Sequence, residues 1–237
     1  MERIHQDLFY LILMSVPPRK IFKLSVVSKR WNELIHREEF WRISSLPYKI
    51  AKPKSKSYCW LVIAMQPFNG KNGVGTIRDY HGDITDRKCT GYGITLLNDV
   101  AFYGSYVDGM RNGFMNYYNF DMSKKGFGAY ANGKPTGVIK EFNKGTHSEI
   151  HYIDGKIKTG KSTYISGNTY EGELLEVIKD NGVRTSKPNG YGVYTWKNQV
   201  RYAGLFVKGF KNGEGVIILP SEEEYPGTWC DDKRILG

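Results

Sequence analysis

Along most of the chain, bulky apolar residues alternate with polar ones in a unit that recurs every 22–24 residues. The unit opens with an aromatic residue, a glycine and a second apolar residue at alternate positions, as in Tyr202, Gly204 and Phe206. Side chains two apart in a strand point to the same face, so the pattern predicts rows of rings and glycines on one side of a sheet. Successive units start at Tyr80, Phe102, Gly126, Ser148, Tyr170, Tyr202 and Tyr225.

Further glycines recur in phase with these units. Gly209 and Gly213 lie seven and eleven residues after Tyr202, and the same offsets recur in other units. Glycine adopts positive φ at low cost, so these positions suit the tight turns of β-hairpins. Because glycine has no side chain, an aromatic ring can also lie over its backbone. We therefore predict that each unit is one β-hairpin, stacked on the next in an elongated, single-layer antiparallel sheet.

Two features break the regularity of the units. The third and fourth copies depart most from the pattern, because Gly126, Ser148, Ile150 and Thr159 replace the expected residues. One interval is 32 residues long, which indicates an insertion near 175–189. Its Asn-Gly pair at 181–182 is a strong turn signal, so the insertion predicts either an elongated hairpin or a recognition loop.

The unit resembles the MORN repeat, whose pattern is close to Tyr-x-Gly-x-Trp/Phe-x-x-Gly-x-x-x-Gly-x-Gly. The segment 202–215 matches nearly throughout, and 80–93 lacks only the middle glycine, where Arg87 stands. The resemblance covers about residues 62–237, and we assign residues 58–237 to a sheet of about seven such repeats. It implies the fold but leaves the function open, since these repeats serve membrane contact, protein scaffolding and spacing.

Before the repeats, from Ile4 to Trp41, the apolar spacing becomes helical. Pro17-Pro18 ends a first helix, a second follows to Val27, and Ser28 can cap a third. Three short helices in about forty residues cannot bury this much apolar surface among themselves. We therefore expect part of that surface to meet a partner.

This head, residues 1–43, resembles an F-box. Val27 to Trp31 read Val-Ser-Lys-Arg-Trp, the core of the family pattern, and 38–41 read Glu-Glu-Phe-Trp, its ending. Asp7 takes the acidic position of the pattern, and His5 replaces its usual proline. The resemblance implies docking on the Skp-type adaptor of a cullin-RING ubiquitin ligase. The adaptor-binding residues that it implies are Ile4, Leu8, Leu11, Ile12, Val16, Leu24, Val27 and Trp31.

The formal net charge of +10 is concentrated in front of the repeats. Residues 1–57 carry a net charge of +7, whereas residues 58–237 carry +3. Residues 44–57 contain two prolines, four serines and four lysines, which is typical of a solvated linker. The lysine run is also compatible with a nuclear address or with contact to an anionic membrane. The nearly balanced charge of the repeats predicts no binding of nucleic acid.

Three groups of residues match the patterns of metal, phosphate or thiol sites only in part. His147, Glu149 and His151 share one face of a strand, but a fourth metal ligand is not evident. The segment 155–162 formally matches a phosphate-binding loop, but strand pattern continues where that loop needs a helix. Three widely spaced cysteines, Cys59, Cys89 and Cys230, suggest neither a disulfide framework nor a metal cluster. We expect no enzymatic activity, no cofactor and no metal, and a reducing compartment, cytosol or nucleus.

The sequence therefore predicts an α+β protein with a three-helix F-box, a basic linker and a repeat sheet. The combination implies a substrate-recruiting subunit of an SCF-type ligase whose repeats hold a protein target. It resembles proteins encoded by large DNA viruses of amoebae, which would act through a host adaptor. The alternative is a repeat scaffold or peripheral membrane protein without a ligase role.

Overall fold

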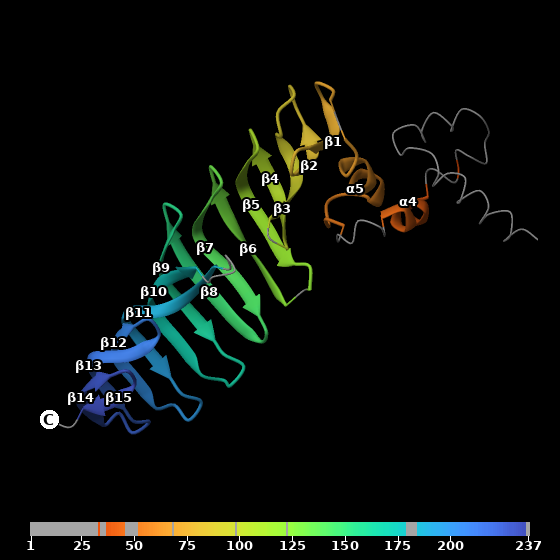
Figure 1. Ribbon diagram of the computed structural model, residues 1–237. Coiled ribbons are helices and arrows are strands. Elements are labelled where there is room, and N and C mark those ends of the chain that lie inside the picture. The colour runs from red at the N-terminus through yellow and green to blue at the C-terminus, as the bar shows by residue number, and fades with distance from the viewer. Residues whose placement is uncertain are drawn as a thin grey trace, which may run out of the picture. The chain divides into compact units, whose positions relative to one another are not determined.

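The computed structural model describes residues 33, 37–45, 52–67, 69–97, 99–121, 123–178 and 184–235. Within them, the elements with described bounds are helices α4 and α5 and strands β1 to β15 (Figure 1). The chain divides into two compact units, which meet in sequence at Arg111 and Asn112. Most of the described structure is antiparallel sheet, as the hairpin pattern predicted.

In the first unit, each strand from β1 to β4 pairs antiparallel with the strand that follows it. The elements are α4 (Glu38–Ser45), α5 (Tyr58–Ala64), β1 (Gly73–Ile77), β2 (Tyr80–Ile84), β3 (Gly91–Leu97) and β4 (Val100–Val107).

The second unit holds β5 from Asn112 onward and strands β6 to β15, and strands β5 to β15 also pair antiparallel in sequence order. Their bounds are β5 (Met110–Asn119), β6 (Lys124–Ala131), β7 (Lys134–Asn143), β8 (Thr146–Ile153), β9 (Lys156–Thr163), β10 (Thr169–Ile178), β11 (Arg184–Thr195), β12 (Arg201–Val207), β13 (Phe210–Ile218), β14 (Glu224–Cys230) and β15 (Lys233–Ile235). The predicted succession of hairpins is confirmed within each unit.

Many hairpins close through two residues that both have positive φ. Asn132 and Gly133 have φ values of 49° and 80°, and Lys208 and Gly209 have 51° and 100°. Such turns match the right-handed twist of the flanking strands, and Asn-Gly is their favoured sequence. The glycines that lie seven residues after the start of a repeat, such as Gly133 and Gly209, are therefore in turns, as their spacing predicted.

Each sheet has one face on which the tyrosines of the repeats are buried, and we call it the tyrosine face. In the second unit, Tyr170 and Tyr202 are fully buried on it and pack around Phe206 and Trp229. The ring of Tyr202 meets those of Phe206 and Trp229 edge to face, at 5.3 and 4.9 Å between centroids. The hydroxyl of Tyr170 donates to the carbonyl of Glu173, and Tyr80 repeats this bond to Asp83 in the first unit. The rings thus pack each hairpin on the next, and the hydroxyl bonds hold each ring to its own strand.

A row of glycines crosses the strands beneath these rings. Gly172, Gly192, Gly204, Gly215 and Gly227 are cross-strand partners in succession from β10 to β14. A Cβ atom on Gly215 would lie 2.5 Å from the Tyr202 ring, so the ring occupies the space of the missing side chain. The prediction that aromatic rings lie over glycine backbone is confirmed.

The irregular third and fourth copies are compensated by their neighbours. Gly126 takes the place of a tyrosine, and the ring of Tyr117 fills the space above it, 2.5 Å from where its Cβ would be. Gly160 lies under Leu174, at the start of the insertion, with a Cβ-to-Cδ1 distance that would also be 2.5 Å. Large residues on one strand therefore pair with small ones on the next, although the repeat pattern is lost.

The insertion forms an elongated hairpin. Strands β10 and β11 continue to pair from Leu174 opposite Pro188 to Ile178 opposite Arg184, after a shift of register next to Gly172. The predicted turn at 181–182 lies outside the described residues. The long hairpin is confirmed, and the role of a recognition loop stays a prediction.

Helix α5 was not predicted from the sequence. The sequence analysis placed the start of the sheet domain at residue 58, whereas the structure has this helix there and its first strand at Gly73. Ser57 caps the helix, because its hydroxyl accepts from the amide of Trp60 at 3.0 Å. Thr76 of β1 donates from its amide to Gln66 and from its hydroxyl to Ala64, both at 2.7 Å. The helix and the turn after it therefore cover the free edge of β1.

The buried tyrosines make alkaline stability a test of this packing. Burial raises the pKa of Tyr80, Tyr106, Tyr117, Tyr170 and Tyr202 above the ordinary value of about 10. Their contribution to stability is complete below pH 10 and is lost as the pH rises through the raised values. We expect cooperative unfolding above pH 10, with simultaneous changes in circular dichroism and tyrosinate absorbance. Full ionisation of the tyrosines near pH 10, with unchanged circular dichroism, would contradict the packing.

Candidate functional site

The residues predicted to bind an adaptor lie outside the described residues. They are Ile4, Leu8, Leu11, Ile12, Val16, Leu24, Val27 and Trp31. The described part of the head is helix α4, which contains the Glu-Glu-Phe-Trp ending of the F-box pattern. The structure therefore describes the end of the head, and the adaptor surface stays a prediction.

Helix α4 is anchored by two aromatic residues. Phe40 and Trp41 are buried, and their ring centroids lie 4.9 Å apart in an edge-to-face arrangement. The amide of Tyr58, the first residue of α5, donates to the carboxylate of Glu38 at 2.8 Å. The end of the F-box pattern thus packs within the first unit and is held against α5.

Asp83 on β2 joins α5 to the sheet. Its carboxylate accepts from the indole nitrogen of Trp60 at 2.8 Å and from the amide of Tyr92 at 3.0 Å. The ammonium of Lys56 pairs with it at 3.0 Å and lies over the rings of Trp60 and Tyr92. These groups lie far apart in sequence, so neither spacing nor motif could reveal them. Lys56 belongs to the predicted solvated linker, but here its ammonium holds the helix to the sheet.

We expect Asp83→Ala to loosen α5 selectively. The change takes the carboxylate away from its three donors, Trp60, Tyr92 and Lys56. It should lower the free energy of opening this partly buried junction by about 2 kcal/mol. Hydrogen exchange of residues 58–64 should accelerate, while that of strands β12 to β14 should not. Asp79→Ala, at an exposed turn position of the same unit, is the control and should leave both rates unchanged. Unchanged exchange in α5 of the Asp83 variant would show that the junction is held by other contacts.

The histidine cluster of the fourth copy lies on β8, with all three side chains exposed. Glu149 is paired with Lys140 at 2.7 Å, and the lysine holds the pKa of that carboxyl below its ordinary value. The ring of His147 packs on Phe142 at 4.9 Å between centroids. Among the described residues, groups of three or more His, Cys, Asp or Glu that could hold a metal are absent.

The segment that resembles a phosphate-binding loop is strand β9. Lys161 pairs across the strands with Glu171 at 3.1 Å, and the hydroxyl of Ser162 bonds that of Ser148 at 2.9 Å. A turn and then β10 follow, so no helix presents its amides at this point of the described chain. The side chains that would contact a phosphate are engaged in holding neighbouring strands together.

The three cysteines are free thiols. Burial, helped by the nearby Glu38 carboxylate, raises the pKa of Cys59 to about 11. Burial also raises the pKa of Cys89. A thiol with a raised pKa carries little thiolate at neutral pH, so neither is poised as a nucleophile.

Two hollows of the described surface are wide open to solvent. One of about 530 Å³ lies in the second unit between Tyr191, Glu214 and Pro226. The other, of about 640 Å³, lies in the first unit near Arg78, Lys88 and Asp108. Lys88 and Asp108 pair with each other at 3.2 Å, so these charges neutralise one another. The second hollow also holds Cys89, but the raised pKa of this thiol disfavours the thiolate that a nucleophile needs.

Comparison with known proteins identifies the head of the chain. Residues 1–43 match the F-box domain family, so the chain carries an F-box domain, as the sequence pattern predicted. F-box domains bind Skp1 and through it a cullin, and F-box proteins are generally substrate adaptors rather than enzymes. The match implies a role in substrate recognition by an SCF-type ubiquitin ligase.

The chain also has distant likenesses to other proteins. A stretch of 78 residues is 31% identical to alsin of Mus musculus and covers 31% of this chain but 4% of alsin. The TCP domain of Drosophila melanogaster SAS-4, solved with a proline-rich motif of Ana2, shares 14% identity at a TM-score of 0.20. That likeness covers 59% of this chain and 90% of the solved domain. The TCP10 domain of Danio rerio CPAP, solved with a STIL peptide, shares 11% identity at a TM-score of 0.17. This likeness covers 70% of this chain and 97% of the solved domain.

The helices in the described part of the chain are too short or too polar to cross a membrane.

Proposed function

We propose that this chain is the substrate-recruiting subunit of an SCF-type ubiquitin ligase. Its F-box binds a Skp-type adaptor, and its hairpin sheet, built of MORN-type repeats, holds a protein target. The F-box match at residues 1–43 carries the proposal. The open, side-chain-rich surface of the repeats supports it, because a recruiting arm needs contact area rather than a catalytic cleft.

The junction between head and sheet also supports this role. A ligase transfers ubiquitin to a target held at a defined place, so the target-binding part must be linked firmly to the adaptor-binding part. Phe40 and Trp41 bury the end of the F-box pattern, and Asp83 ties α5 to β2 and β3. Helix α4, which holds the end of the F-box pattern, is thus joined to α5, and α5 to the first repeats, within the first unit.

The proposal includes the adaptor contacts and the compartment. Ile12 and Trp31 take the central apolar positions of the family pattern, so we assign them to the adaptor interface. We place the chain in the cytosol or nucleus, where free thiols persist and SCF ligases act. If it is encoded by a virus, as the pairing of modules resembles, the adaptor is the host's.

Binding of the full chain to a purified Skp-type adaptor tests the proposal. We expect saturable binding that Ile12→Asp combined with Trp31→Ala reduces at least a hundredfold, because a charge enters and a ring leaves the apolar interface. Tyr191→Ala, at an exposed residue of the sheet, is the control and should bind as the wild type does. Circular dichroism must show equal folding of all three proteins.

The same experiment resolves the role of His5. His5→Pro restores the family residue and should tighten binding, because proline favours the first turn of a helix. A folded wild type that leaves the adaptor unbound, together with a His5→Pro variant that also fails, would overturn the ligase proposal. The repeats would then be a scaffold in their own right.

A further inference from the structure

We propose that the face opposite the tyrosine face, over strands β5 to β9, is the recruiting surface and fits an acidic, extended protein segment with apolar side chains. This inference rests on the proposed function and names the chemistry of the target. We call this area the lysine–phenylalanine surface. Its residues are Phe114, Lys125, Phe127, Lys134, Val138, Lys140, Phe142, His147, Glu149, Lys156 and Lys161.

The register places these side chains together. Phe127, Lys140, Glu149 and Lys161 are cross-strand partners in one row from β6 to β9. Paired residues of an antiparallel sheet share a face, so this row stands on the face that the buried tyrosines do not use. Lys125, Phe142 and His147 form the adjacent row.

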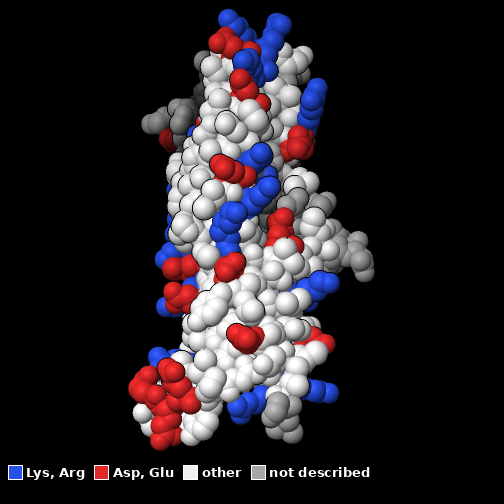
Figure 2. Space-filling view, turned by 90° about the vertical axis from the view of Figure 1, so that its left-hand side faces the viewer, with Lys and Arg blue, Asp and Glu red and all other residues white. Residues whose placement is uncertain are grey.

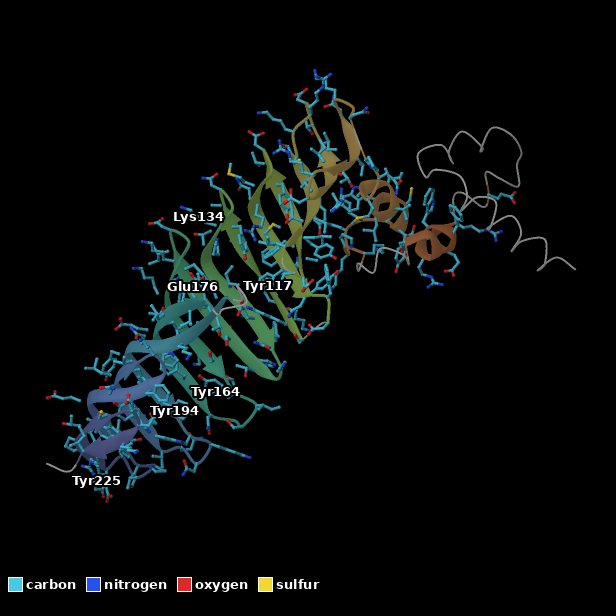
Figure 3. All side chains as sticks on the ribbon, in the orientation of Figure 1. Tyr117, Lys134, Tyr164, Glu176, Tyr194 and Tyr225 are labelled. Carbon is cyan, nitrogen blue, oxygen red and sulfur yellow. The ribbon has the colours of Figure 1, made fainter. Side chains whose placement is uncertain are left out.

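The charge of this surface is strongly one-sided. The five lysines Lys125, Lys134, Lys140, Lys156 and Lys161 stand on it, and Glu149 is its one carboxylate in β5 to β9. Lys140 and Lys161 are engaged with Glu149 and Glu171. Within the part of the chain that the structure describes, Lys125, Lys134 and Lys156 have no carboxylate partner. In Figure 2, Lys and Arg side chains run down the middle of the view with Asp and Glu side chains beside them, and Figure 3 places Lys134 at the tip of its hairpin.

Phenylalanine rings run diagonally between the lysines. The centroids of Phe114 and Phe127 lie 5.8 Å apart, and those of Phe127 and Phe142 lie 6.3 Å apart. Phe114 is 57% exposed and Val138 is 46% exposed, although side chains of this size are usually buried. Lys125 extends over the ring of Phe142, with its nitrogen 5.6 Å from the centroid. The rings therefore form an apolar strip with cations along its sides.

In the first unit, apolar residues on the face opposite the tyrosine face are shielded from solvent. There, Ile94 and Tyr103 lie opposite the tyrosine face and are almost completely buried. The same face of β5 to β9 carries exposed rings instead. Exposed apolar strips rimmed by polar groups are typical of protein-binding surfaces.

The surface favours a protein segment over other anionic partners. Glu149 lies in the middle of the lysines and would repel a continuous run of phosphates. The rings pack on each other rather than standing apart, so they leave no slots for stacked bases. Strands β6 to β9 are paired on both sides, so a partner must be held by side chains, with carboxylates on the lysines and apolar groups on the rings.

Fluorescence anisotropy with a labelled Glu-Glu-Phe peptide, four repeats long, tests the inference on the full chain. The triple variant Lys125→Glu, Lys134→Glu and Lys156→Glu should weaken binding at least tenfold. The control, Lys144→Glu, Lys197→Glu and Lys208→Glu, makes the same change of charge at exposed turns and should stay within twofold. Phe142→Ser should also weaken binding at least fivefold.

The probes separate the possible partners. A Glu-Glu-Ser peptide should bind at least fivefold more weakly than Glu-Glu-Phe, and a Lys-Lys-Phe peptide should not bind. Equal loss of peptide binding in the two triple variants would overturn the inference, as would a wild type that leaves Glu-Glu-Phe unbound. Tighter binding of single-stranded oligothymidine, or of phosphatidylserine vesicles, would also overturn it in favour of nucleic acid or membrane. Adaptor binding, measured on the same proteins, shows separately whether the proposed ligase role holds.

Discussion

Gly192→Val should lower the free energy of unfolding of the second unit by about 3 kcal/mol. A Cβ atom at this position would lie 2.5–2.7 Å from the ring and hydroxyl of Tyr170, which is fully buried. The ring cannot retreat, because its hydroxyl is bonded to the carbonyl of Glu173 and its other side packs on Phe206. Urea denaturation, with hydrogen exchange of β10 to β12 to locate the damage, measures the effect.

Gly133→Asn is the matched control for this prediction. A Cβ atom on Gly133 would meet nothing within 4 Å, and its φ of 80° is one that asparagine tolerates. We expect this change to lower the free energy of unfolding by no more than about 1 kcal/mol, because a positive φ strains a side chain but strains asparagine least. A similar small change for Gly192→Val would mean that the tyrosine rings do not require the glycine row.

Tyr202→Ala should lower the free energy of unfolding by about 3–5 kcal/mol, which is at least as much as Gly192→Val. The ring is fully buried between Phe206 and Trp229, and its hydroxyl donates to the carbonyl of Leu205 at 3.1 Å. Removing it opens a cavity over Gly204 and leaves that carbonyl without its donor. Because repeats of this kind contact mainly their neighbours, strands β12 to β14 should lose protection first.

Two controls separate the causes of this loss. Tyr191→Ala removes the same side chain from the opposite face, where it is 55% exposed, and should cost less than about 0.5 kcal/mol. Tyr202→Phe keeps the ring and removes the hydroxyl, so it should cost about 1 kcal/mol. If Tyr202→Ala costs no more than Tyr202→Phe, the edge-to-face packing contributes little.

The regular repeats were predictable because their structure depends on local contacts. An aromatic residue and a glycine two positions later, as at Tyr170 and Gly172, specify a strand and its buried face. Turn glycines such as Gly209 carry the required positive φ. The F-box was found in the same way, since its apolar spacing and its Val-Ser-Lys-Arg-Trp core are local patterns.

The irregular copies show where local pattern ends. The sequence marks Gly126 as a departure, but the ring that fills its space comes from Tyr117 on the neighbouring strand. Leu174, the residue just before the insertion, covers Gly160 of the preceding copy. Such compensation depends on which strands are neighbours and in what register, and these are not properties of a single segment.

The candidate recruiting surface was missed for a related reason. The charge of the whole repeat region is nearly balanced, which predicted no binding of nucleic acid, but the register gathers five lysines of β6 to β9 on one face. A shift of register after His151 turns Lys156 onto the same face as Lys161, whereas simple alternation would place it on the other. Average charge is therefore a poor guide to the charge of one face.

By itself the sequence determined the F-box head, the hairpin repeat, its phase and the place of the insertion. These follow from propensities and spacings that act within about twenty residues. Only the tertiary structure decided that Asp83 ties α5 to the sheet, that neighbours fill the irregular copies, and that lysines and phenylalanines share one exposed face. Each of these depends on register and packing between strands, where the free energy comes from contacts that no single segment contains.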